Sequence, residues 1–219
     1  SRVYHSALTV FFLTSLFGVL FFSLRKIVCQ RTDDVPLQIG HIILSAALLH
    51  LGLILGFSLT GRPEAALWAE DSRTIYIPGA LNFLDFISGR GALVSTGVPL
   101  KGIFLTQSLT GLFFGLFGIN PASSFLALSV IKLITVFAVF RLGTKLLGEK
   151  AGLVGALLYV LSPTVLYYTT VLYKEAVVQM LVALIGLSLV ELRAPHAKWG
   201  YWLLLIISMG AMLNERFYI

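Results

Sequence analysis

The sequence predicts an all-α integral membrane protein, a polytopic helical bundle, and composition, hydropathy and charge placement each support this. Hydrophobic residues make up 58% of the chain and charged residues only 12%, and the mean hydropathy is +0.92. Apolar runs recur near the length of about twenty residues that a helix needs to cross a hydrocarbon core of about 30 Å. The basic residues behind the net charge of +6 sit in short clusters between those runs, which indicates membrane topology and not a nucleic-acid partner.

Most of the apolar runs are long enough to be predicted as spans. The first is followed by charged residues and not by a small-residue cleavage site, so it is predicted to be a span and not a signal peptide. We expect residues 1–36 to form an additional amino-terminal span with its cytoplasmic turn, and residues 37–219 to form one transmembrane module. The predicted spans lie near Tyr4 to Leu24, Leu37 to Leu59, Ser123 to Phe140, Ala151 to Tyr168, Ala176 to Leu192 and Gly200 to Leu213.

One further apolar run, Gly102 to Gly118, is short for a span, at roughly 25 Å for a rise of about 1.5 Å per residue. If this run does not cross, the basic turns at Arg25 to Arg31, Arg141 to Lys150 and Arg193 to Lys198 all fall on the cytoplasmic side. We therefore expect a re-entrant or juxtamembrane helix. Its glycines share one face, which suits close packing against another helix.

Several isolated residues carry little functional information. Cys29 lies in a basic turn and indicates a reducing cytoplasm without a disulfide framework. His41 and His50 have no acidic or cysteine partner nearby, so a metal site there is not expected. Lys132, in the middle of a predicted span, must face protein or water. Pairing with a neighbouring helix or subunit is preferred to a place in a lipid-carrier groove.

The polar stretch Gly61 to Lys101 is the most informative part of the chain. It opens with Glu70, Asp71, Arg73 and Tyr76, and it is far longer than the four to six residues that a simple connection needs. The predicted topology puts this stretch outside, together with two other charged, tyrosine-rich segments. Those segments contain Lys174-Glu175 and Glu215-Arg216.

Convergence of these segments would suit a transferase that acts on a lipid-linked phosphate. Such an enzyme needs a carboxylate to deprotonate or orient the acceptor and cations to neutralise the leaving phosphate. The chain has no Walker-type phosphate loop, no Cys/His cluster and no Ser/His/Asp nucleophile pattern. A soluble nucleotide-binding domain is also not evident, in agreement with a donor delivered as a lipid phosphate.

The order and spacing of several motifs resemble the GT-C superfamily of polyprenyl-phosphate-dependent glycosyltransferases, closest to the protein O-mannosyltransferase and aminoarabinose-transferase branch. The resemblance extends from about Leu37 to Arg216. Its motifs are Trp68-Ala-Glu-Asp71 with Tyr76, Phe117-Gly118-Ile119-Asn120-Pro121, Phe140 to Gly152, and Leu161-Ser-Pro163 to Tyr168.

The resemblance implies a GT-C-like bundle whose long outer loop, residues 60–101, carries juxtamembrane helices. It implies transfer of a sugar from a polyprenyl-phosphate carrier to an acceptor on the extracytoplasmic face, and the bacterial inner (plasma) membrane is the expected location. Asp71 matches the family's catalytic acidic residue. Glu175 matches a second acidic position, where aspartate is commoner, and with Asp71 it is a candidate ligand of a divalent metal ion. The candidates for substrate and phosphate binding are Lys174, Arg216, Glu70, Arg73 and Tyr76.

Plainer interpretations stay open for each of these residues. Glu70 and Asp71 would also stabilise the amino terminus of an interfacial helix, and Lys174-Glu175 would also be an ordinary start to a span. Glu215-Arg216 would also be a weak surface ion pair. GT-C transferases generally have further spans, so a carboxy-terminal half or a partner subunit is expected.

Two other functions remain alternatives. The first is a surface-polysaccharide polymerase or ligase, whose acceptor is itself lipid-linked. The second is a non-catalytic membrane scaffold or transporter subunit, in which Asp71 and Glu175 would tolerate replacement by their amides.

Overall fold

The computed structural model describes the chain over residues 39–42, 48, 52, 72–91, 105–119, 121–162, 164–166, 172, 174–194 and 198–216. Every regular element within these ranges is a helix, which confirms the predicted all-α class. The predicted span Tyr4 to Leu24, most of Leu37 to Leu59, and the acidic pair Glu70-Asp71 lie outside the described residues.

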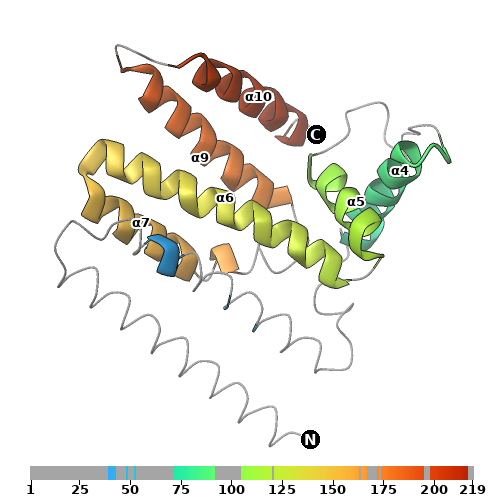
Figure 1. The fold of residues 1–219 in the computed structure, drawn as a ribbon. Coiled ribbons are helices and arrows are strands. Elements are labelled where there is room, and N and C mark those ends of the chain that lie inside the picture. Colours follow the sequence, from blue (N-terminus) through green and yellow to red (C-terminus); the bar gives the residue numbers. More distant parts are fainter. Residues whose placement is uncertain are drawn as a thin grey trace, which may run out of the picture.

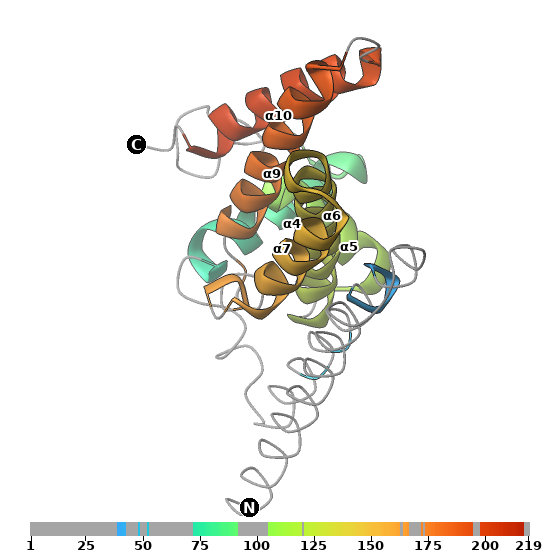
Figure 2. The same cartoon turned by 90° about the vertical axis from the view of Figure 1, so that its left-hand side faces the viewer.

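Four helices form the main body. They are α6 (Pro121–Leu147), α7 (Glu149–Leu161), α9 (Lys174–Leu192) and α10 (Trp199–Arg216). The long helix α6 packs against α7 on one side and against α9 on another, and α10 packs on α9 (Figure 1). Viewed at right angles, α10 lies beyond α9 and away from α6 and α7 (Figure 2).

A smaller pair of helices packs at the end of the body where α6 begins. The π-helical turn η2 (Ser72–Tyr76) leads directly into α4 (Ile77–Ile87), and α5 (Leu105–Phe117) packs on both α4 and α6 (Figure 1). The outer stretch therefore contains a helix, as expected. The 13-residue α5 is shorter than the predicted run Gly102 to Gly118, and its membrane placement stays a prediction.

Glycines allow α5 to approach α4 closely, as their spacing predicted. A Cβ at Gly111 would lie 2.5 Å from the carbonyl oxygen of Ala80, and one at Gly115 would lie 3.0 Å from Cδ1 of Leu84. Gly118 has a φ of 85° and ends α5, and its amide donates to the carbonyl of Phe114.

Helix α6 is longer than its predicted span, and the prediction of a basic loop after Phe140 is wrong. Arg141 and Lys145 belong to the last turns of α6, and only Gly148, with a φ of 93°, separates α6 from α7. Arginine, lysine and leucine favour helical conformation, so the helix continues past the apolar run. With 27 residues, α6 is about 40 Å long at about 1.5 Å per residue.

The backbones of α6 and α7 meet where this turn brings them together. A Cβ added to Gly143 would lie 2.8 Å from the Cα of Gly152. Further along the pair, Val136 and Phe140 pack against α7 in a buried cluster with Ile42. The α7 members of this cluster are Leu153, Ala156, Leu157 and Val160.

The predicted span Ala151 to Tyr168 is also corrected, because α7 ends at Leu161. Pro163 follows two residues later, and a residue before proline is disfavoured in helical conformation. Ser162 accordingly has φ −55° and ψ 121°. The two later predictions differ from α9 and α10 by at most three residues at either end.

Two of the described helices are long and apolar enough to cross a membrane by length and composition, Ser123–Leu147 within α6 and Lys174–Leu192. One face of α6 leaves large apolar side chains exposed at helical spacing, which suits contact with lipid. These side chains are Leu126, Val130, Ile134 and Phe137.

Candidate active site

The end of the bundle where α9 begins gathers residues from all three segments that the sequence places outside. Tyr76, from the outer stretch, is 7% exposed and lies in one buried cluster with Leu172 and Ala176. The cluster is completed from α6 by Leu128 and Ile131. Partly buried side chains of α5 and α10 pack against it: Leu105, Leu109, Ala211 and Met212.

A carboxylate at the end of α10 is bound by the first turn of α5. The backbone N–H of Thr106 donates to Oε1 of Glu215 at 2.9 Å, and the Thr106 hydroxyl donates to the same oxygen at 3.2 Å. The first backbone N–H groups of a helix have no partner within it. Glu215 therefore caps α5 from a distant part of the chain.

Glu215 is fully buried, at 0% exposure, so its interpretation as half of a surface ion pair is wrong. It lies beyond the predicted span Gly200 to Leu213. Burial raises the pKa of Glu215 above 4.5, and the hydrogen bonds from Thr106 and the charge of Lys174 oppose that rise. Its second oxygen, Oε2, is buried and has no hydrogen-bond partner among the residues that the structure describes.

The next residue of α5 holds the outer stretch. Nε2 of Gln107 donates to the carbonyl oxygen of Ile75 at 3.2 Å, within η2 and one residue before Tyr76. The Gln107 amide lies against α4 at Gly79, where any Cβ would overlap it. A glycine is therefore needed at position 79 for this side chain to reach Ile75.

The other predicted site residues are only partly placed. Lys174 and Glu175 begin α9 at this same end, and both are half-buried. Within the described part of the chain, the buried Oε2 of Glu175 has no hydrogen-bond partner. Arg73 is exposed within η2. Arg216 ends α10, but its side chain is outside the described residues, as are Glu70 and Asp71.

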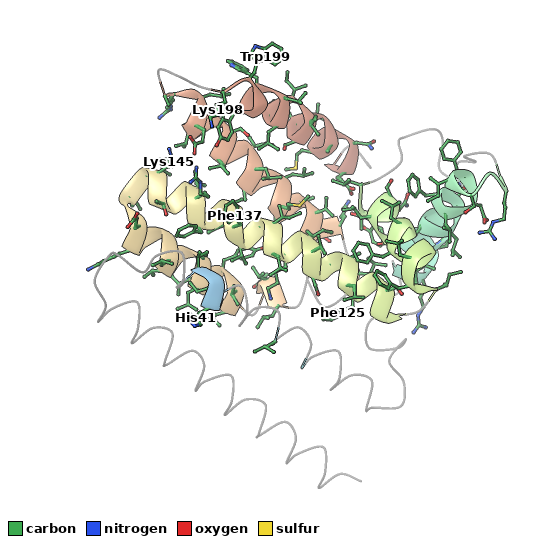
Figure 3. All side chains as sticks on the ribbon, in the orientation of Figure 1. His41, Phe125, Phe137, Lys145, Lys198 and Trp199 are labelled. Carbon is green, nitrogen blue, oxygen red and sulfur yellow. The ribbon has the colours of Figure 1, made fainter. Side chains whose placement is uncertain are left out.

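The opposite end of the bundle is basic. Nη2 of Arg141 lies 3.0 Å from Oε1 of Glu191, and Nζ of Lys145 lies 3.3 Å from Oε2 of the same carboxylate. Lys145 and Lys198 lie at this end, and Phe125 lies toward the other end of α6 (Figure 3). Two basic clusters that the predicted topology puts on one side thus share one end of the bundle.

Between the two ends, polar side chains lie inside the bundle. Lys132 is 1% exposed, and its Nζ has no hydrogen-bond partner among the described residues. The expected pairing with a neighbouring helix is therefore not seen in this part of the chain. The Tyr159 hydroxyl of α7 donates to Oε1 of Gln179 of α9 at 2.9 Å, so these helices are joined by a polar contact.

No group of three or more His, Cys, Asp or Glu side chains with metal-binding geometry occurs in the part of the chain that the structure describes. The buried Oε2 of Glu175 is nevertheless the type of oxygen that a hard divalent cation prefers. Asp71, the other predicted ligand, lies outside the described residues.

The helical bundle, with its two helices long and apolar enough to cross a membrane and its exposed apolar stripe on α6, is consistent with a membrane protein of the GT-C type. The sequence profile of the dolichyl-phosphate-mannose-protein mannosyltransferase family matches residues 103–219. The chain belongs to this family, which at a coarse level is one of glycosyltransferases with polyprenyl-phosphate-linked sugar donors. No curated protein and no solved structure was found to be similar to the chain.

Proposed function

We propose that the chain transfers a sugar from a polyprenyl-phosphate carrier to an acceptor hydroxyl on the extracytoplasmic face of a membrane, such as the bacterial inner membrane. The observation that carries the proposal is the gathering of Tyr76, Lys174, Glu175 and the end of α10 at one end of the bundle. The family match supplies the reaction class. Arg141 and Lys145, at the opposite end, support the assignment of that end to the cytoplasm.

The proposed reaction is a single displacement. Asp71 orients the acceptor hydroxyl and accepts its proton as the acceptor oxygen bonds to the anomeric carbon. The bond between that carbon and the phosphate oxygen breaks, and the carrier phosphate leaves with the electron pair. Lys174 and Arg216 neutralise the phosphate. One displacement inverts the configuration at the anomeric carbon.

Glu175 assists at the same end of the bundle. Its Oε2, which has no hydrogen-bond partner among the described residues, fits either a hydrogen bond from the acceptor or, together with Asp71, a divalent ion. Such an ion would supply positive charge next to the phosphate. Glu70, Arg73 and Tyr76 are proposed to shape the substrate-binding surface of the outer stretch.

The test is sugar release from radiolabelled dolichyl-phosphate mannose by membranes that contain the full chain. We expect Asp71→Asn to lower turnover by about 10²–10⁴-fold without changing expression or membrane insertion. The matched control is Asp85→Asn, because Asp85 is an exposed acidic residue of α4 that pairs with Arg90 at the surface. Normal turnover by Asp71→Asn would refute the proposed mechanism.

The acceptor separates this proposal from its alternatives. Label recovered on a hydroxyl-bearing peptide supports protein glycosylation, and label on a lipid-linked saccharide supports the polymerase or ligase. Full turnover by both Asp71→Asn and Glu175→Gln would support a scaffold or transporter subunit.

A further inference from the structure

We infer that Glu215 is a positioning residue for the outer segment, which we define as η2 and α4 (Ser72–Ile87). It is linked to this segment through the first turn of α5. The inference rests on the proposed function, in which Asp71 acts on the acceptor. It assigns to the end of α10 a task that is separate from phosphate binding.

Thr106 binds the Glu215 carboxylate in a buried environment. Glu215 is 0% exposed and Thr106 is 1% exposed, so their two hydrogen bonds, at 2.9 Å and 3.2 Å, are shielded from water. Hydrogen bonds are stronger in the low dielectric of a buried site than in water. The start of α5 is thereby fixed to the end of α10.

Helix α5 is joined in turn to the outer segment. Gln107, adjacent to Thr106, donates to the carbonyl oxygen of Ile75, and its amide occupies the space beside Gly79. These contacts hold η2 and α4 at two places. Asp71 directly precedes η2 in the sequence, so the place where η2 begins sets the place from which Asp71 reaches the acceptor.

Hydrogen bonds fix the position of η2 and α5 more specifically than apolar packing does. The apolar cluster around Tyr76 also packs this region, but apolar contacts are not directional. The hydrogen bonds of Thr106 and Gln107 define one register of α5 against α10 and η2. Loss of the Glu215 carboxylate would leave the buried amide of Thr106 without its acceptor and would loosen that register.

Amide hydrogen exchange on the full purified chain in lipid nanodiscs tests the linkage without any substrate. We expect Glu215→Ala to raise exchange about tenfold in Ser72–Ile87 and at the start of α5, whereas Glu215→Gln, which keeps an oxygen acceptor, stays within about twofold of the wild type. The control Glu191→Ala removes a buried carboxylate at the opposite end, and at amides that exchange by local opening it should leave Ser72–Ile87 within about twofold of the wild type. If the amides of Ser72–Ile87 in the Glu215→Ala variant exchanged at the wild-type rate, the inference would be overturned.

A second variant covers the case in which Glu215→Ala does not fold. Gln107→Leu retains bulk and removes only the bond to Ile75, so faster exchange should be confined to Ser72–Ile87, with α10 as in the wild type. Unchanged exchange in Ser72–Ile87 of this variant would equally overturn the inference.

Turnover of radiolabelled dolichyl-phosphate mannose tests the functional part. Misplacement of Asp71 should lower kcat about tenfold in Glu215→Ala, with KM for the donor nearly unchanged and with recovery in Glu215→Gln. An unchanged kcat in a variant whose outer segment is loosened would overturn the positioning role. Failure of the proposed function would instead appear as full turnover by Asp71→Asn, and the exchange comparison does not depend on that result.

Discussion

Arg141 of α6 and Glu191 of α9 lie fifty positions apart in the sequence, and a 3.0 Å ion pair joins their side chains at the basic end of the bundle. Lys145 contacts the second oxygen of the same carboxylate. This end is thus held by charge pairs, whereas the end where α9 begins is held by hydrogen bonds to Glu215 and by apolar packing.

Removal of the buried carboxylate should weaken the basic end. We expect Glu191→Ala to lower the free energy of unfolding by about 1–2 kcal/mol, because two cations lose their partner while remaining partly exposed to water. Denaturant unfolding in one detergent measures the change. Asp85→Asn is the control, since its pair with Arg90 is more than half exposed and should contribute less than about 0.5 kcal/mol.

The close approach of the α6 and α7 backbones predicts that replacing one glycine of α7 lowers the free energy of unfolding. A Cβ at Gly152 would lie 2.6 Å from the carbonyl oxygen of Phe140 and 2.8 Å from the amide nitrogen of Thr144. We expect Gly152→Ala to cost about 1–3 kcal/mol in unfolding free energy. Gly155→Ala, one turn away and 3.9 Å from Cγ1 of Val139, should be tolerated, and equal effects of the two substitutions would contradict this explanation.

The buried ammonium of Lys132 is expected to destabilise the folded state. Lys132→Met keeps a long side chain and removes a desolvated polar group that has no hydrogen-bond partner in the described part of the chain. We expect the free energy of unfolding to rise by about 1–3 kcal/mol. A decrease on replacement would show that Lys132 is paired or binds an anion in the folded protein.

The buried carboxyl of Glu215 predicts a pH dependence of stability. Its folded-state pKa is raised by burial above the ordinary 4.5, so the folded state binds this proton more tightly than the unfolded chain does. The resulting stabilisation is fully present below pH 4.5 and is lost as pH rises through the folded pKa. Melting temperatures measured across this range should fall less steeply for Glu215→Gln than for the wild type, and parallel curves would contradict the assignment.

The helical class and the approximate positions of α9 and α10 were predictable because apolar length alone determines them. Helix ends were less predictable, since α6 continues through Arg141 and Lys145 by local helical propensity and α7 stops before Pro163. The site was predicted only in outline. Sequence position brings Lys174 and Glu175 to the outer end, but nothing local distinguishes a surface glutamate from the buried Glu215. Only its tertiary contact with Thr106 does so.

The single-residue connection at Gly148 also bears on the order in which the chain assembles. Helices α6 and α7 contact each other locally, so their hairpin can form as soon as both have left the ribosome. The contact between Thr106 and Glu215 spans 109 positions and must wait for the end of α10 to be synthesised. The end of the bundle where α9 begins is therefore the last part to close, and a nascent chain fixes the start of α5 only when the rest of this helical body is in place.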